Sequence, residues 1–331
     1  MEGSIVLNVM NEKDYYSLYS EYLKDKYGEK VYKLPVQIPV TCPNRMKNGK
    51  GCTFCSEVGT GFEALEQTMS ITEQLEQTRV KIEKKYKAHK FIAYFQNFTN
   101  TFCSLDVFKK AIEEAIEFPN IVEISISTRP DCIHDDYLQF LSDISSQSGI
   151  HITIELGLQT INYHTLQKIN RGHGLAEYVD AVLRISKYNQ FTIGTHMILN
   201  FPYNTIEDEK EAIRFLSALP IHIVKFHSLY IPKQTQLYEE YERGEITLCS
   251  KEEYLERLTE CIALLREDIV VERLFSRVPE EYAAFSNWGT SWWKLKDEFL
   301  DMMNTKGYVQ GCHCDYLNGS ALRKWRVHDG K

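Results

Sequence analysis

Short β-rich runs alternate with longer amphipathic segments through the middle of the chain, and this alternation restricts the possible folds more than any other feature. About six such β/α units lie between residues 36 and 231. We expect strands at 36–40, 91–95, 122–127, 150–156, 192–199 and 221–230, and helices at 70–87, 105–118, 135–146, 176–187 and 207–219. This pattern is typical of a parallel sheet covered by helices, and both an open doubly wound sheet and a barrel-like sheet fit it. In either fold, ligands bind at the carboxyl ends of the strands.

The same pattern divides the chain into three parts. Residues 1–35 are expected to form an N-terminal helical extension, residues 36–232 the β/α core, and residues 233–331 a mostly helical C-terminal extension packed on the core. The spacing of Tyr15, Leu18 and Tyr22 predicts a helix that packs on the outside of the core. In the C-terminal extension we expect helices at 251–266 and near 292–303, with a strand-like segment at 269–272.

The charge balance argues against a strong attraction of polyanions to the protein as a whole. The chain has 38 Lys and Arg residues against 46 Asp and Glu residues, a net charge of −8. A nucleic acid would therefore have to meet a local basic patch, although a solvated helix face and a frayed tail explain the two candidates better when each is taken alone. The two candidates are Lys81, Lys84, Lys85, Lys87 and Lys90, and Arg323, Lys324, Arg326 and Lys331.

No apolar run is long enough to cross a bilayer, and the N-terminus lacks a cationic start before an apolar stretch. We therefore expect a soluble cytoplasmic protein without a membrane partner.

Three of the nine cysteines lie on one loop directly after the first expected strand. Cys42 is followed by Cys52 and Cys55, and Gly49 and Gly51 stand between them. Glycines suit a loop that wraps around a bound group, because no Cβ obstructs the backbone. Structural zinc needs four closed ligands, and no second ligand pair follows at a suitable spacing. Three cysteines can instead hold a [4Fe-4S] cluster with one iron open to substrate or cofactor, so we favour the cluster over zinc.

A cysteine triad after the first strand of a six-unit β/α chain resembles the radical S-adenosylmethionine (SAM) superfamily. The gap of nine residues between the first two cysteines is similar to that of the catalytic subunit of Elongator and its bacterial relatives. From about residue 15 to about residue 310, the chain resembles one bacterial Elongator-like family. Some members of this family (the MnmL type) act on the side chain of the tRNA wobble uridine. The segments that carry this resemblance are EKVYKLPV, CPNR, GCTFCS, IAYFQNFTNT, STRPDC, IELGLQT and NRGH.

The resemblance implies a fold, two cofactors and a reaction. The fold would be a partial (β/α)6 TIM-like barrel, and Cys42, Cys52 and Cys55 would hold the [4Fe-4S] cluster. The cluster would pass an electron to SAM, giving methionine and a 5′-deoxyadenosyl radical that abstracts hydrogen from the substrate. The implied partners are tRNA as substrate and an electron donor such as flavodoxin or ferredoxin.

The resemblance also implies which residues contact SAM. Gln159 would face the ribose, and Arg171 would bind the methionine carboxylate, which matches the planar fork of a guanidinium. A buried carboxylate at Glu155 is costly without a partner, and a salt bridge with Arg129 or Arg171 is the alternative to a role at SAM. The full set of expected SAM contacts is Phe54, Gln96, Ser127, Glu155, Gln159, Arg171 and His196.

Two other functions stay open at this point. The chain could be a metal-stabilised binding module without turnover, or a radical SAM enzyme that acts on a small molecule, as porphyrin-synthesis relatives do. Lys225 and His227 alternate with Val224 and Phe226 on the sixth strand, so they share one face. They would contact substrate if that face lines the barrel and would meet the covering helices if it does not.

Overall fold

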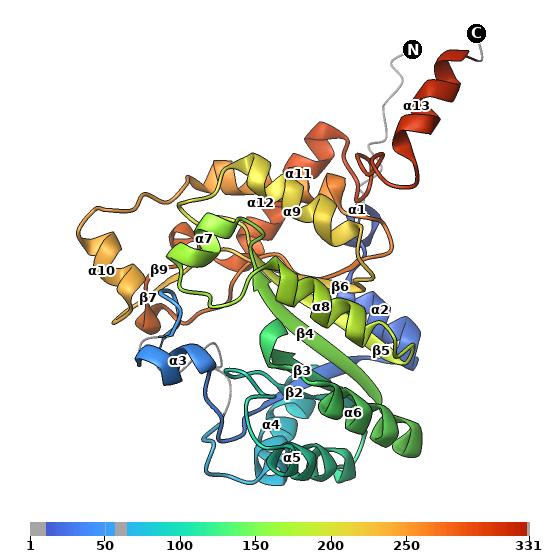
Figure 1. Ribbon diagram of the computed structural model, residues 1–331, viewed down its shortest axis with the longest axis vertical. Coiled ribbons are helices and arrows are strands. Elements are labelled where there is room, and N and C mark those ends of the chain that lie inside the picture. The colour runs from blue at the N-terminus through green and yellow to red at the C-terminus, as the bar shows by residue number, and fades with distance from the viewer. Residues whose placement is uncertain (1–10, 50, 57–64, 330–331) are drawn as a thin grey trace.

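The computed structural model describes residues 11–49, 51–56 and 65–329. Its core is a sheet of seven parallel strands in the order β1-β2-β3-β4-β5-β6-β8 (Figure 1). The strands are β1 (Val31–Val36), β2 (Lys90–Phe95), β3 (Ile121–Thr128), β4 (His151–Gln159), β5 (Phe191–Ile198), β6 (Ile223–His227) and β8 (Val270–Arg273). A doubly wound sheet reverses its strand order at a switch point, and this order has no reversal. The barrel-like alternative is therefore confirmed.

Amphipathic helices cover the outer face of the sheet and connect successive strands. In α5, for example, Phe108, Ala111, Ile112 and Ala115 are buried, and Ser104 caps the first turn through its side chain. The covering helices are α4 (Ile71–Tyr86), α5 (Leu105–Glu117), α6 (Asp135–Ser148), α8 (Leu175–Ile185), α9 (Ile206–Ser217) and α11 (Lys251–Leu264).

The sheet curls into a half-barrel, and its two edge strands meet at a seam. Lys33 on β1 and Glu272 on β8 form an ion pair of 2.7 Å across this seam. The chain just before α2 (Tyr19–Tyr27) adds backbone contacts there, because the Val271 amide donates to the Ser17 carbonyl at 2.8 Å and Leu18 bridges to Val271. The open side of the half-barrel is thus closed by side chains and by N-terminal residues.

The remaining elements lie around the ends of the half-barrel, and α13 projects away from the body (Figure 1). No helix in the described part of the chain is long and apolar enough to span a membrane. The remaining helices are α1 (Glu12–Tyr15), α3 (Pro43–Asn48), α7 (Tyr163–Lys168), α10 (Gln236–Glu242), α12 (Trp292–Lys306) and α13 (Ser320–Asp329). The 3-10 turns are Pro130–Cys132, Glu280–Tyr282 and Asn287–Gly289, and β7 (Ile231–Pro232) pairs antiparallel with β9 (Ala283–Phe285).

The structure corrects the sequence analysis at both edges of the sheet. The first strand covers Val31–Val36 rather than 36–40, so all of it except Val36 lies within the segment expected as the N-terminal extension. Pro35 is tolerated there because β1 is an edge strand. The strand-like segment at 269–272 pairs with β6 and is the seventh strand of the sheet. The single N-terminal helix expected from Tyr15, Leu18 and Tyr22 is two helices, α1 and α2, with a break between them.

Candidate functional site

One cavity at the carboxyl ends of the strands collects every residue that the sequence predicted for the site. It has a volume of about 720 Å³. Its lining includes Cys42, Cys52, Phe54, Cys55, Gln96, Ser127, Glu155, Gln159, Arg171 and His196. The structure brings these side chains together from the cysteine loop, from the ends of β2 to β5 and from the loop after α7. Their individual roles as ligands stay predictions.

The cysteine loop starts with a short helix and turns through two glycines. Cys42 is the N-cap of α3, and Gly49 ends this helix with a φ of 73°. Gly51 has a φ of 76°, and a Cβ at this position would lie 3.3 Å from the Arg45 side chain. Because positive φ strains residues that carry a Cβ, this path requires glycine at both positions.

A second loop, after α7, holds the cysteine loop in place. Asn44 Nδ2 donates to the carbonyl oxygens of Asn170 (2.5 Å) and Arg171 (2.9 Å). In return, Asn170 Nδ2 donates to the Gly51 carbonyl at 2.6 Å. Gly172 makes this approach possible, because a Cβ there would lie 2.3 Å from Asn44 Oδ1. The segments CPNR and NRGH, far apart in sequence, therefore form one structural unit.

Each thiol of the loop lies beside a guanidinium group. The N–S distances are 3.6 Å from Arg171 Nη1 to Cys52, 3.5 Å from Arg45 Nη2 to Cys55 and 4.0 Å from Arg129 Nη1 to Cys42. Burial raises the pKa of the Cys55 thiol, as does the neighbouring Cys52, whereas Arg45 lowers it. Cations beside three thiols fit an anionic iron–sulfur cluster, whose protein ligands are thiolates.

The thiols of an iron–sulfur site bind different irons and need not converge on one point. Among residues 11–49, 51–56 and 65–329, no three His, Cys, Asp or Glu side chains form a site for a single metal ion.

Arg171, which lines the cavity, has one donor without a partner in the described part of the chain. Its Nη2 donates to the Gly157 carbonyl at 2.6 Å, while its Nε is buried and has no hydrogen-bond partner in the described part of the chain. Gly157 permits this position, because a Cβ there would lie 2.7 Å from Arg171 Nη2. A buried unpaired guanidinium N–H is costly, and a ligand carboxylate would satisfy it. The residues present therefore fit both the cluster and the methionine end of SAM.

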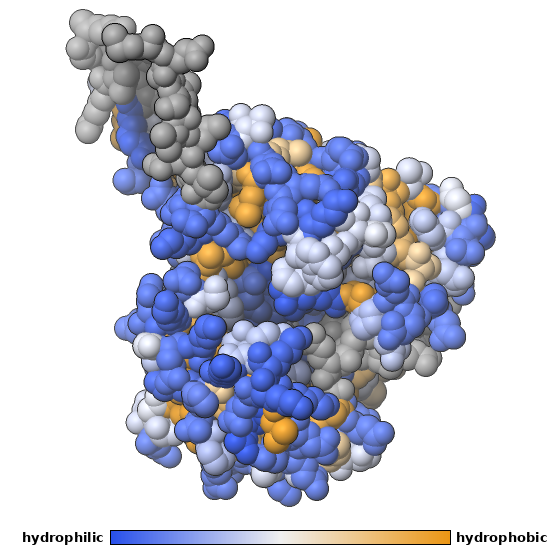
Figure 2. Space-filling model, turned by 180° about the vertical axis from the view of Figure 1, so that it is seen from behind, coloured by the Kyte–Doolittle hydropathy of each residue, from blue (hydrophilic) through white to orange (hydrophobic). Residues whose placement is uncertain are grey.

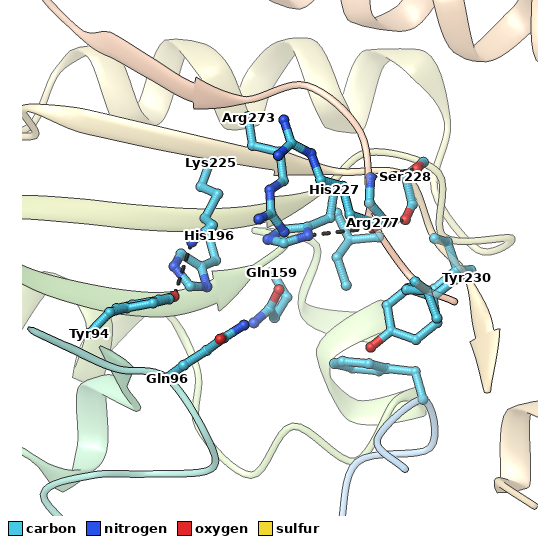
Figure 3. A pocket seen from close by; sticks show the side chains of 15 residues that line it. Tyr94, Gln96, Gln159, His196, Lys225, His227, Ser228, Tyr230, Arg273 and Arg277 are labelled. Carbon is cyan, nitrogen blue, oxygen red and sulfur yellow. Dashed lines mark hydrogen bonds between the residues drawn. The ribbon is translucent and has the colours of Figure 1, made fainter. Parts of the chain in front are cut away.

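Gln159 occupies a strained position at the end of β4. It has a φ of 76°, and the register between β4 and β5 shifts at this point. Such left-handed conformations are unfavourable for residues other than glycine and often occur at functional sites. The bulge lets Gln159 line two neighbouring cavities, the one described above and a second one described below (Figure 3).

Glu155 lies at the centre of a buried polar network inside the half-barrel. Lys33 and Lys225, which bind it, also pair with Glu272 at 2.7 and 2.8 Å. The network thus contains two carboxylates and two ammonium groups, and it ties both edges of the sheet to its centre. The groups that donate to the Glu155 carboxylate are Lys33 Nζ (2.6 Å), Tyr94 Oη (3.1 Å), Ser125 Oγ (2.6 Å), Ser127 Oγ (3.4 Å), His196 Nε2 (2.6 Å) and Lys225 Nζ (3.4 Å).

The expected alternative for Glu155, a salt bridge with Arg129 or Arg171, is wrong. Arg129 instead pairs with Asp131 at 2.8 Å. Although burial raises the pKa of Glu155, the ammonium groups of Lys225 and Lys33 hold it well below its usual value. The actual partners were not identifiable from the sequence, because Lys33 belongs to a strand placed too late in the chain.

The network also fixes the state of His196. Burial lowers the pKa of this imidazole despite its hydrogen bond to Glu155. A neutral ring beside an ionised carboxylate carries its hydrogen on the nitrogen that faces the carboxylate, here Nε2. Nδ1 is then a hydrogen-bond acceptor, available to a ligand in the cavity.

A second cavity, of about 650 Å³, is shown in Figure 3 and adjoins the first. The two share Phe54, Gln96, Gln159 and His196. Lys225 and His227 also line this second cavity, so the face they share on β6 lines the barrel, whereas Val224 and Phe226 lie in the hydrophobic core.

The sequence analysis missed two cationic residues of the second cavity. Both Arg273, the last residue of β8, and Arg277, just beyond the strand, line this cavity (Figure 3). The available signal was the strand-like segment at 269–272, after which polar residues at a carboxyl strand end are expected. The sequence analysis assigned this segment to the C-terminal extension, so the arginines that follow it were not considered for the site.

Comparison with family models identifies the architecture. The model of the Radical SAM superfamily matches residues 36–216, and the model of the Radical SAM C-terminal domain matches residues 221–305. Among curated proteins, YtqA of Bacillus subtilis is 30% identical over 303 residues, which are 91% of this chain and 92% of that protein.

Two more distant relatives have descriptive names. A tRNA uridine(34) acetyltransferase of Methanocaldococcus infernus is 25% identical over 179 residues, covering 51% of this chain and 32% of that protein. The solved structure of Methanocaldococcus infernus Elp3 superposes with a TM-score of 0.63 at 19% identity, covering 85% of this chain and 64% of that chain. At this identity the likeness shows a shared fold. From the matched family model, the chain belongs to the radical SAM superfamily, whose members bind a [4Fe-4S] cluster and SAM.

Proposed function

We propose that this protein modifies the side chain of the uridine at the tRNA wobble position. The observation that carries the proposal is the pair of adjoining cavities, one beside the cysteine loop and one lined by Lys225, His227, Arg273 and Arg277. The second cavity combines two arginines with aromatic and apolar side chains, a lining that suits a nucleotide, whose base is flat and whose phosphates are anionic. The segment shared with a tRNA uridine(34) acetyltransferase and the motifs of the Elongator-like family support the same substrate.

When bound, the cluster and SAM supply one-electron chemistry through reductive cleavage of SAM. In this proposal, Cys42, Cys52 and Cys55 hold the cluster, and Arg171 binds the methionine carboxylate through its Nε. His196 accepts a hydrogen bond from SAM through Nδ1, oriented by Glu155. Phe54, Gln96, Ser127 and Gln159 complete the SAM cavity.

Gln96, Gln159 and His196 also face the second cavity, so they would lie between SAM and the substrate base (Figure 3). A reduced flavodoxin or ferredoxin would supply the electron, and a tRNA substrate places the reaction in the cytoplasm.

The substrate can be tested directly with tRNA from a strain that lacks the gene. The anaerobically reconstituted enzyme is incubated with SAM, reduced flavodoxin and this tRNA, and 5′-deoxyadenosine and modified nucleosides are measured by mass spectrometry. We expect 5′-deoxyadenosine formation to increase with tRNA and the wobble nucleoside to change mass. If the tRNA nucleosides of the deletion strain equal those of its parent, the wobble uridine is not the substrate, and a small molecule in the second cavity takes its place.

Replacing Arg273 with alanine should impair the use of tRNA but not the binding of SAM. The side chain lines the second cavity and is absent from the first. Loss of a charge-assisted hydrogen bond costs about 1.5–3 kcal/mol, so we expect kcat/KM for tRNA to fall roughly 10-fold to 100-fold. Iron content and the Kd for SAM should stay unchanged. Arg214→Ala, on the outer helix α9, is the matched control, and equal kcat/KM values for the two variants would remove Arg273 from the substrate site.

A further inference from the structure

A long groove runs along the seam between the two edge strands, outside the half-barrel. It has a volume of about 1420 Å³ and lies between α1, α2, β1, β8 and the start of α12. Its lining includes Arg273 and Arg277, which also line the second cavity. The groove and the proposed substrate site therefore adjoin at these two arginines. Seen from behind, the molecule is hollowed across its middle, and hydrophilic residues border the hollow (Figure 2).

The described lining of this groove combines aromatic and cationic side chains. It contains five aromatic residues, of which Tyr16 and Phe275 are buried in the hydrophobic core, and five cationic residues against two glutamates, in a protein whose net charge is −8. A cationic groove with interspersed aromatic rings is typical of surfaces that bind single-stranded nucleic acid, because bases stack on the rings and phosphates meet the cations. The residues are Tyr16, Tyr19, Tyr32, Phe275 and Trp292, and Lys30, Lys33, Arg273, Arg277 and Lys296.

The rings at the two ends of the groove are held in place by neighbouring groups. The Arg277 guanidinium lies 4.0 Å from the centre of the Trp292 ring at the end near the second cavity. At the other end, Tyr32 stacks on Tyr86 with ring centres 4.5 Å apart. Rings that are ordered before binding lose less conformational entropy when a base stacks on them.

The cations differ in how strongly they are engaged within the protein. Lys33 is held by Glu155 and Glu272, and Lys296 pairs with Glu12 at 2.6 Å. Lys30 is exposed just before the start of β1. Among the ion pairs of the described residues, none joins Lys30 to a carboxylate. Lys30 is therefore the cation of this groove best placed for a phosphate group.

The basic segment that includes Lys84 and Lys85 continues from the far end of this groove. Lys85 Nζ lies 5.0 Å from the centre of the Tyr86 ring, which in turn stacks on Tyr32. The segment ends at Lys90, where β2 begins, so it lies at the opposite end of the sheet from the cysteine loop. The groove connects these two ends.

We propose that this groove binds the single-stranded nucleotides that flank the target uridine in the RNA substrate. Bases stack on the Arg277–Trp292 pair and on Tyr32, the backbone passes Lys30, and the target base turns into the second cavity past Arg273. This inference rests on the proposed function, because it assigns a surface to the same tRNA substrate.

The aromatic part of the inference is tested by binding without turnover. An anticodon stem-loop RNA with a fluorescent label is titrated with the cluster-loaded enzyme and SAM, in the absence of a reductant. Trp292→Leu should weaken binding roughly 5-fold to 100-fold, the range for the loss of one stacked base. Trp325→Leu is the matched control, because this tryptophan is 58% exposed and is not part of the groove lining. It should change the Kd less than about twofold.

The cationic part is tested by the dependence of binding on salt, with variants at exposed positions. Lys30→Ala should lower the slope of log K against log salt by about 0.7, the value for one phosphate contact to a single strand. Lys187→Ala, at an exposed position beyond the end of α8, should leave the slope unchanged. Charge reversal at Lys84 and Lys85 should weaken binding and flatten the slope further.

The outcomes separate this inference from the function on which it rests. If wild-type enzyme modifies tRNA while Trp292→Leu and Lys30→Ala bind the stem-loop like wild type, the groove is not the docking surface and the proposed function stands. If wild-type enzyme neither binds the stem-loop nor modifies tRNA, both fail. A fully paired hairpin of the same length should bind at least roughly tenfold more weakly, since its bases cannot stack on the rings, and equal affinity would overturn single-strand recognition.

Discussion

Replacing Cys52 with alanine is expected to abolish both the visible absorption of the iron–sulfur cluster and the cleavage of SAM. Cys52 is buried and lies 3.6 Å from Arg171 Nη1 and 3.4 Å from Asn44 Nδ2. Its loss leaves two thiols on the loop, too few to hold a cluster that already lacks a fourth protein ligand. The measurements are iron and sulfide content, the absorption spectrum, and 5′-deoxyadenosine formed with dithionite.

A second cysteine variant controls for general effects of removing a thiol. Cys312 is exposed and lies in the C-terminal part of the chain, away from the cavity. Cys312→Ala should keep its cluster and cleave SAM at the wild-type rate. If Cys52→Ala also cleaves SAM at that rate, the cysteine loop is not the cluster site.

Replacing Glu155 with glutamine is expected to destabilise the protein by about 3–5 kcal/mol, because it leaves one buried ammonium group without a counter-charge. Lys33 and Lys225 would then share only Glu272. The free energy of unfolding is measured by chemical denaturation of the cluster-free protein. Glu207→Gln, on the exposed face of α9, is the matched control and should cost less than about 1 kcal/mol.

Two further measurements connect this loss to the network rather than to packing. In the double variant Lys33→Met with Glu155→Gln, one charge of each sign is removed and the Lys225–Glu272 pair remains. The double variant should therefore be more stable than the sum of the two single changes predicts, by about 1–3 kcal/mol. Additive losses would contradict charge pairing in this network.

The pH dependence of the loss follows from the lowered pKa of Glu155. Because the pKa of Glu155 is lowered in the folded state, its ionised carboxylate stabilises the folded protein at pH values above the ordinary carboxyl pKa. This stabilisation is lost as the pH falls through the folded-state pKa. The difference in stability between wild type and Glu155→Gln should therefore be largest near neutral pH and shrink in acid.

The interior strands of the sheet were predictable from the sequence, whereas its edges were not. β2 to β5 are buried apolar runs between amphipathic helices, and periodicity identifies both. β1 contains Pro35 and the half-buried Tyr32 and Lys33, so the apolar pattern appeared stronger in the residues just after it. β8 has only four residues, and its role as a seventh strand depends on pairing with β6, which no local pattern reveals.

The residues of the site that lie at the carboxyl ends of the strands were predictable from the sequence. In a parallel sheet the carboxyl ends of all strands meet at one edge, so Ser127 and Gln159 had to lie near the cysteine loop. The charge network could not be predicted, because Lys33 meets Glu272 only when the sheet curls and its two edges approach one another. Arg273 and Arg277 enter the second cavity for the same reason.

The central claim is that three thiolates hold the cluster and leave one iron for SAM. Electron–nuclear double resonance of the reduced cluster with SAM labelled at its amino nitrogen tests this most directly. The account predicts a hyperfine coupling between the label and the cluster, which an unlabelled control lacks. A cluster that shows no coupling and whose spectrum is unchanged by SAM would contradict it.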